Sequence, residues 1–247
     1  MKDKLFTLFN NNKKYLLYGG SIVFSRGLEY IILFVAPLLL TKQVYGDLEF
    51  YKRIIEFSST IMVFGLPTLM FTYSKSSNSK VYLLLFSLVV ICLLSIITIP
   101  ILYYFDYLFL LIPILFYSLF FSNGIIQMYL LVAKGSNTAS VYKIIVSCIF
   151  YALVFFLIIY TEKPSFAFVD STIFLFPIGA IFLILLIRSI RAKLNIFLKY
   201  LKLFKKLLVS SSTLVISTIA NMMFLYSDIF IVKLLSENPS IEIANFS

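Results

Sequence analysis

Arg26 and Glu29 are two ionisable residues near the middle of an apolar run that covers residues 15–40. An ionisable side chain in a bilayer interior costs at least about 2.5–3.5 kcal/mol, so its presence there marks a functional site by default. Residues three apart lie on one face of an α-helix, and lipid offers neither charge a partner. This face is therefore expected to look into protein or into a water-filled cavity.

Three further acidic residues fall within apolar runs. Asp228 lies in the outer half of the last run and is the best candidate for a second charged site. Glu56 and Asp170 lie close to the outer ends of their runs, where the penalty for a charge is small and a solvated rim is the favoured interpretation.

Amide side chains and one lysine complete the polar residues of these runs. Asn123 and Gln127 are four residues apart and so share a helix face, where hydrogen bonding between helices explains them better than sugar binding does. Lys143 is expected to extend along the helix to the cytoplasmic interface. Asn221 aligns with Glu29 in an internal comparison described below.

The composition is that of an integral membrane protein. Hydrophobic residues make up 61% of the 247 residues and charged residues only 13%, whereas soluble domains carry about 25% charged residues. The sequence contains no histidine, which excludes histidine metal ligands and histidine-based catalytic triads. Both cysteines fall in apolar runs and are expected to be buried thiols. No metal site, no cofactor and no nucleic-acid partner is expected.

Runs of about 20 apolar residues are long enough to cross the hydrocarbon core of a bilayer. The sequence predicts seven such spans, at residues 15–40, 51–73, 81–105, 107–132, 139–160, 166–187 and 207–235. The expected fold is an all-α, polytopic membrane protein with short connections.

Lysine and arginine predict the orientation of these spans, because they are enriched on the cytoplasmic side. With the N-terminus inside, fifteen basic residues fall on the cytoplasmic side. Five fall on the outer side: Lys42, Lys52, Arg53, Lys163 and Lys233. Residues 188–206 alternate apolar and basic positions at helical spacing, which predicts an amphipathic helix in the cytoplasmic interface.

The seventh span resembles the first. Residues 13–29 align with residues 205–221 without a gap; both stretches begin with a lysine pair, and Glu29 falls opposite Asn221. Repeats of this kind are common in transporters, whose cavity lies between the repeated lobes. We therefore expect a six-helix lobe at 1–187, an interfacial linker at 188–206, and at 207–247 the first helix of a second lobe. A truncated chain is the favoured explanation; a fragment or a self-assembling half-transporter is the alternative.

Several short motifs resemble the oligosaccharide flippases of O-antigen and capsule synthesis, in the superfamily of the multidrug-and-toxin-extrusion transporters and the lipid II flippase. They are the arginine of the first span, Leu-Leu-Thr-Lys-Gln-Val-Tyr-Gly at 39–46, Phe-Gly-Leu-Pro-Thr at 64–68 and Asp-Ile-Phe-Ile-Val at 228–232. Phe64 departs from the leucine usual in the family.

This resemblance implies two six-helix lobes around a cavity that opens alternately to either side of a bacterial plasma membrane. The implied cargo is an undecaprenyl-diphosphate-linked oligosaccharide, whose pyrophosphate Arg26 would bind; the structural alternative is an Arg26–Glu29 pair that only locks the helix. Glu29 would neutralise Arg26 or take up a proton. Other membrane proteins of polysaccharide assembly are expected partners, and no enzymatic activity is expected. The alternatives are a multidrug exporter of related fold and a polysaccharide polymerase or ligase.

Overall fold

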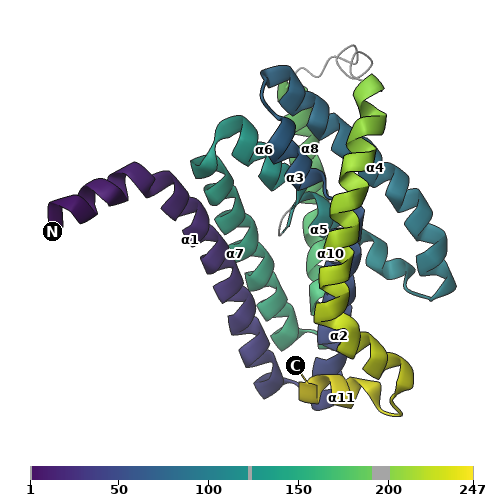
Figure 1. The fold of residues 1–247 in the computed structure, drawn as a ribbon. Coiled ribbons are helices and arrows are strands. Elements are labelled where there is room, and N and C mark those ends of the chain that lie inside the picture. The colour runs from purple at the N-terminus through teal and green to yellow at the C-terminus, as the bar shows by residue number, and fades with distance from the viewer. Residues whose placement is uncertain (1, 122–123, 191–200, 247) are drawn as a thin grey trace.

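The computed structural model describes residues 2–121, 124–190 and 201–246, and every regular element in these ranges is a helix (Figure 1). The α-helices are α1 (Lys2–Leu39), α2 (Lys42–Val63), α3 (Leu66–Tyr73), α4 (Ser77–Tyr104), α5 (Leu111–Leu119), α6 (Ile125–Lys134), α7 (Ser136–Tyr160), α8 (Ala167–Ile190), α10 (Leu201–Leu235) and α11 (Pro239–Phe246). Two short 3₁₀ helices, η1 (Leu108–Leu110) and η2 (Pro164–Phe166), precede α5 and α8.

The helices form a multi-pass membrane bundle, which confirms the all-α polytopic fold. Four helical segments are long and apolar enough to cross a membrane, in α1, α4, α7 and η2–α8, and two bent pairs raise the number to six. One pair is α2 and α3, bent by 42°; the other is the two halves of α10, bent by 61°. Large apolar side chains such as Leu38 and Phe224 are 84% and 85% exposed, as expected where lipid is the surrounding solvent.

The predicted continuous span at 107–132 is wrong. This stretch consists of η1, α5 and α6, with a break after α5. The backbone turns so sharply at Gly124 that a Cβ there would come within 2.8 Å of the Leu119 carbonyl oxygen. Across the break, the Tyr142 hydroxyl of α7 donates a 3.0 Å hydrogen bond to the Phe120 carbonyl. Hydropathy does not reveal the break, because the helices on both sides of it, α5 and α6, are apolar.

The predicted start of the second span is also wrong, because α2 begins at Lys42 and not near residue 51. The α2–α3 bend lies at Phe64 and Gly65, both in the left-handed region with φ of 52° and 65°. Glycine adopts this conformation readily and phenylalanine does not. The hydroxyl of Ser211 in α10 donates to the Phe64 carbonyl freed at the bend, so α10 supports the break.

Two long helices, α1 and α7, lie side by side over much of their length (Figure 1). The N-terminal half of α1 projects away from the bundle. In the packed half, the hydroxyls of Ser25 and Ser147 are 2.7 Å apart and join the two helices. Aromatic rings fill the space between α5 and α7; the Phe121 and Phe150 centroids, for example, are 4.4 Å apart. These contacts fix the face of α1 that carries the two predicted charges.

The last helix, α11, packs across the beginning of α2 (Figure 1). The two backbones approach so closely at Gly46 that a Cβ there would overlap the carbonyl of Ser240. The Ser240 hydroxyl donates a 2.6 Å hydrogen bond to Asp47, and Lys42 Nζ donates one of 3.1 Å to the Asn245 side chain. The predicted amphipathic helix at 188–206 lies largely at 191–200, outside the described residues.

Candidate functional site

The Arg26–Glu29 pair predicted from the sequence is present. Arg26 Nη1 donates a 2.7 Å hydrogen bond to Glu29 Oε2. The Glu29 side chain is 7% exposed, whereas that of Arg26 is 56% exposed. The carboxylate therefore anchors one edge of the guanidinium, and the rest of the arginine faces open space.

Helix α2 supplies a second cation to the same carboxylate. Lys52 Nζ lies 2.8 Å from Glu29 Oε1 and 3.8 Å from Glu56 Oε1, and its side chain is 1% exposed. A buried ammonium is tolerated only where opposite charges compensate for its lost hydration. Glu29 therefore stands between a buried cation on α2 and a half-exposed one on α1.

One turn of α2 extends the network. Arg53 lies 2.5 Å from Glu49 Oε1 and 3.6 Å from Glu56 Oε2. From α10, Tyr226 donates a 3.1 Å hydrogen bond to Glu56, and its ring lies 5.0 Å from the Arg53 guanidinium carbon. Helices α1, α2 and α10 are thus joined by polar contacts in the bundle interior.

We call these six residues the charged cluster: Arg26, Glu29, Glu49, Lys52, Arg53 and Glu56. With all groups ionised, its three cations balance its three carboxylates. One oxygen, Glu49 Oε2, accepts no hydrogen bond within the described part of the chain.

A cavity of about 250 Å³ opens beside the charged cluster. Three cluster members line it together with aromatic, aliphatic and hydroxyl side chains and one more lysine: Ile22, Ser25, Arg26, Glu29, Glu56, Tyr117, Phe121, Lys143 and Tyr151. Lys143 is 8% exposed. The prediction that its side chain extends to the interface is wrong, because the chain turns this residue of α7 toward the cavity.

Glu56, predicted on a solvated rim, is instead a member of the charged cluster with 16% side-chain exposure. Its position four residues after Lys52 on α2 turns it inward. Glu56 therefore lines the same cavity as Arg26 and Glu29.

The remaining predicted residues do not join this cavity. Asp228 is exposed, and its carboxylate accepts a 2.9 Å hydrogen bond from the next backbone N–H. Asn221 is exposed on α10, and Asp170 is half-buried in α8.

Of the predicted amide pair, Gln127 is 3% exposed, and its side-chain amide donates a 3.4 Å hydrogen bond to the Tyr18 hydroxyl. This contact joins α6 to α1 and fits the predicted hydrogen bonding between helices. Asn123 lies outside the described residues.

Sequence reasoning missed three members of the cluster on α2: Glu49, Lys52 and Arg53. Lys52 and Arg53 were counted only among the basic residues of the outer side. The signal that identifies them is spacing: Glu49, Lys52, Arg53 and Glu56 recur at intervals of three and four, which places all four on one helix face.

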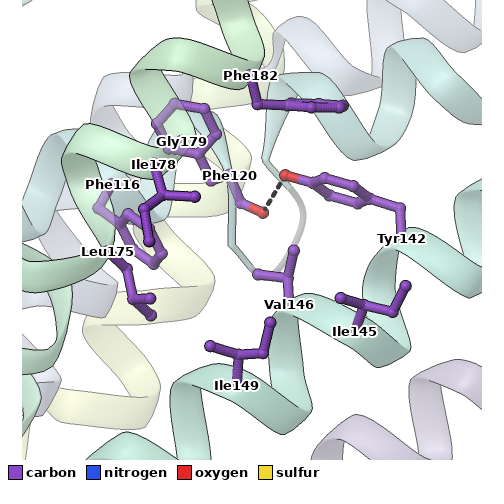
Figure 2. A pocket seen from close by; sticks show the side chains of 10 residues that line it. All are labelled: Phe116, Phe120, Tyr142, Ile145, Val146, Ile149, Leu175, Ile178, Gly179 and Phe182. Atoms are coloured by element: carbon purple, nitrogen blue, oxygen red, sulfur yellow. Dashed lines mark hydrogen bonds between the residues drawn. The ribbon is translucent and has the colours of Figure 1, made fainter.

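A second cavity, of about 310 Å³, lies between α5, α7 and α8 on the other side of α7. Figure 2 shows its aliphatic and aromatic walls, with the Tyr142 hydroxyl turned to the Phe120 carbonyl. No charged side chain lines it, so this cavity offers nothing to an ionic ligand.

Comparisons with known proteins place the chain in a family. No curated protein and no solved structure shows significant similarity to the chain. A family described as polysaccharide biosynthesis protein matches residues 12–246, nearly the whole of the chain. The chain therefore belongs to the polysaccharide biosynthesis protein family.

Proposed function

We propose that the chain serves in moving an undecaprenyl-diphosphate-linked oligosaccharide across a bacterial plasma membrane by alternating access. Family membership supports a role in polysaccharide synthesis or transport. The observation that carries the step to a flippase is Arg26, a half-exposed guanidinium beside a cavity in a membrane-spanning bundle.

The chemistry of the cargo matches this arrangement. The pyrophosphate is the part of a lipid-linked sugar that a bilayer tolerates least. Arginine binds phosphate oxygens through paired N–H donors and stays charged under all physiological conditions. Glu29 holds the guanidinium from one edge and leaves its other donors available to the cargo. Other membrane proteins of polysaccharide assembly are proposed partners.

Export of a cationic drug by a related fold is the second candidate among transporters. A cation needs acidic side chains free of counter-ions, but the two carboxylates at this cavity, Glu29 and Glu56, are each paired with cations. Arg26 and Lys143 at the same cavity would repel such a cargo.

A polysaccharide polymerase or ligase is the candidate from a different class. Such an enzyme needs an outer loop that presents catalytic groups. Among the described residues, only two separate α1 from α2 and three separate α7 from η2, so these connections leave little room for a catalytic surface.

The test is complementation of a strain that lacks the gene. We expect Arg26→Ala to abolish surface polysaccharide at normal protein level, and Arg26→Lys to restore part of it, because the charge is kept while the paired donors are lost. Polysaccharide is measured by immunoblot and protein level by an epitope tag.

The matched control is Arg188→Ala, which removes an exposed arginine at the end of α8. Its strain should make normal polysaccharide. Normal polysaccharide in the Arg26→Ala strain would contradict the role of Arg26, and drug sensitivity of the deletion strain would favour the exporter.

A further inference from the structure

Lys143 is a buried lysine for which the described part of the chain supplies no partner. It is 8% exposed, lines the cavity beside the charged cluster, and makes no ion pair or hydrogen bond with any described residue. Another cation, Arg26, lines the same cavity. A buried charge without compensation is costly, so the position calls for an anion that the described residues do not supply.

The balance of charge around the cavity also indicates a place for an anion. The charged cluster is neutral by itself, so Lys143 is the one cation in excess among the described residues at this site. Arg26 is the member of the cluster with most of its side chain still open. An anion in the cavity would therefore meet Lys143 from α7 and Arg26 from α1.

We propose that Lys143 and Arg26 form a two-cation site for a phosphate or pyrophosphate group. Arginine supplies a planar fork of donors, and lysine supplies a compact point charge, a combination suited to tetrahedral oxyanions. The inference rests on the proposed function, to which it adds a second binding residue on a different helix. Because α1 and α7 contribute one cation each, the bound anion would bridge these two packed helices.

The site can be tested without transport. Purified protein in lipid nanodiscs is titrated calorimetrically with inorganic pyrophosphate, and undecaprenyl pyrophosphate in the nanodisc is then tested as a competitor. We expect Lys143→Met to weaken pyrophosphate binding by about tenfold or more, because hydrogen bonds to charged groups are worth at least that factor. Lys143→Arg should restore most of the affinity.

Lys134→Met is the matched control, since it removes the same charge from an exposed position at the end of α6. It should bind like the wild type. Equal binding by Lys143→Met and wild type, or an equal loss in Lys134→Met, would overturn the site. Failure of undecaprenyl pyrophosphate to compete would assign the site to a free anion and not to a lipid headgroup.

A second measurement uses the wild-type protein and avoids misfolded variants. Pyrophosphate should protect Lys143, and not Lys134, from reductive methylation detected by mass spectrometry; unchanged labelling of Lys143 would overturn the site.

The flippase proposal and the anion-site proposal can fail separately. Binding that depends on Lys143, together with normal polysaccharide in the Arg26→Ala and Lys143→Met strains, would refute the flippase and keep the anion site. Lost polysaccharide in the Arg26→Ala strain, with binding unaffected by Lys143→Met, would refute the anion site alone.

Discussion

At the scale of single residues, Lys52 holds the charged cluster together. Its ammonium lies between Glu29 of α1 and Glu56 of α2, and its side chain is almost wholly enclosed. Two carboxylates this close repel each other in a medium of low dielectric, and the cation between them removes that repulsion. A lysine counted among the outer basic residues from the sequence is therefore a central residue of the interior.

Lys52→Met should lower the free energy of unfolding by about 3–5 kcal/mol, the usual cost of leaving a buried charge without its partner. Unfolding in mixed micelles of detergent and dodecyl sulfate measures this change. Lys75→Met, at an exposed position between α3 and α4, is the control and should have little effect.

The double variant Lys52→Met, Glu29→Gln separates charge from packing. Removing the carboxylate that has lost one of its two cations should recover part of the lost stability, so the two changes should not add. Strict additivity would mean that the 2.8 Å contact between Lys52 and Glu29 contributes no coupling.

The candidate site was predictable in part. An arginine and a glutamate in an apolar run identified Arg26 and Glu29, because charge is so costly there. On α2, Glu56 was predicted on a rim, and Glu49, Lys52 and Arg53 were missed, since a helix with six ionisable residues in its first fifteen resembles a connection more than a span. Lys143 was recognised as a cation, but its direction depends on the packing of α7 against α1, which no local pattern records.

At the scale of elements, the bundle uses breaks where the sequence predicts continuity. The α2–α3 bend is signalled by Gly65 and the following Leu-Pro, which belong to the Phe-Gly-Leu-Pro-Thr motif at 64–68. The break between α5 and α6 carries a weaker signal, a single Gly124 in an apolar run. Hydropathy finds how much apolar chain is present, but it does not show where the backbone turns.

Gly46→Ala should detach α11 from α2, because the added methyl group would overlap the Ser240 carbonyl. We expect the free energy of unfolding to fall by about 1–3 kcal/mol, as is usual for overpacking. The change can be followed by the protease sensitivity of the α10–α11 connection together with the unfolding measurement above.

Gly27→Ala is the matched control, since a Cβ at this position of α1 would meet nothing within 4 Å. Alanine favours a helix over glycine by about 1 kcal/mol, so this variant should be neutral or slightly stabilised. Equal effects of the two substitutions would contradict the close packing of α11 on α2.

At the scale of the whole molecule, three segments that were predicted on the same side of the membrane lie at the same end of the bundle. The beginning of α2, the η2 segment and α11 lie at one end of the bundle: the rings of Tyr51 and Phe166 stack at 4.9 Å, and Lys42 bonds Asn245. These three segments were all predicted on the outer side. Lys52 and Arg53 belong to the charged cluster, so three of the five basic residues predicted on the outer side, Lys42, Lys163 and Lys233, lie outside it, which sharpens the predicted charge asymmetry.

The orientation itself can be measured with single cysteines in a Cys92→Ser, Cys148→Ser background. Glu162→Cys, in the connection after α7, should react in intact cells with a maleimide that does not cross membranes. Ser76→Cys, in the connection before α4, should react only after the cells are opened. Both positions are exposed; the reverse pattern would place the N-terminus outside.

The packing of α11 across α2 joins two segments that the ribosome makes far apart in time. Ser240 and Asp47 are separated by 193 residues, so at 5–20 residues per second the ribosome needs roughly 10–40 s to supply the second partner. During that interval α2 can already neutralise its charges against α1, since Glu29 and Lys52 emerge close together in time. Synthesis would thus form the ion pairs between α1 and α2 early, and the packing of α11 on α2 only later.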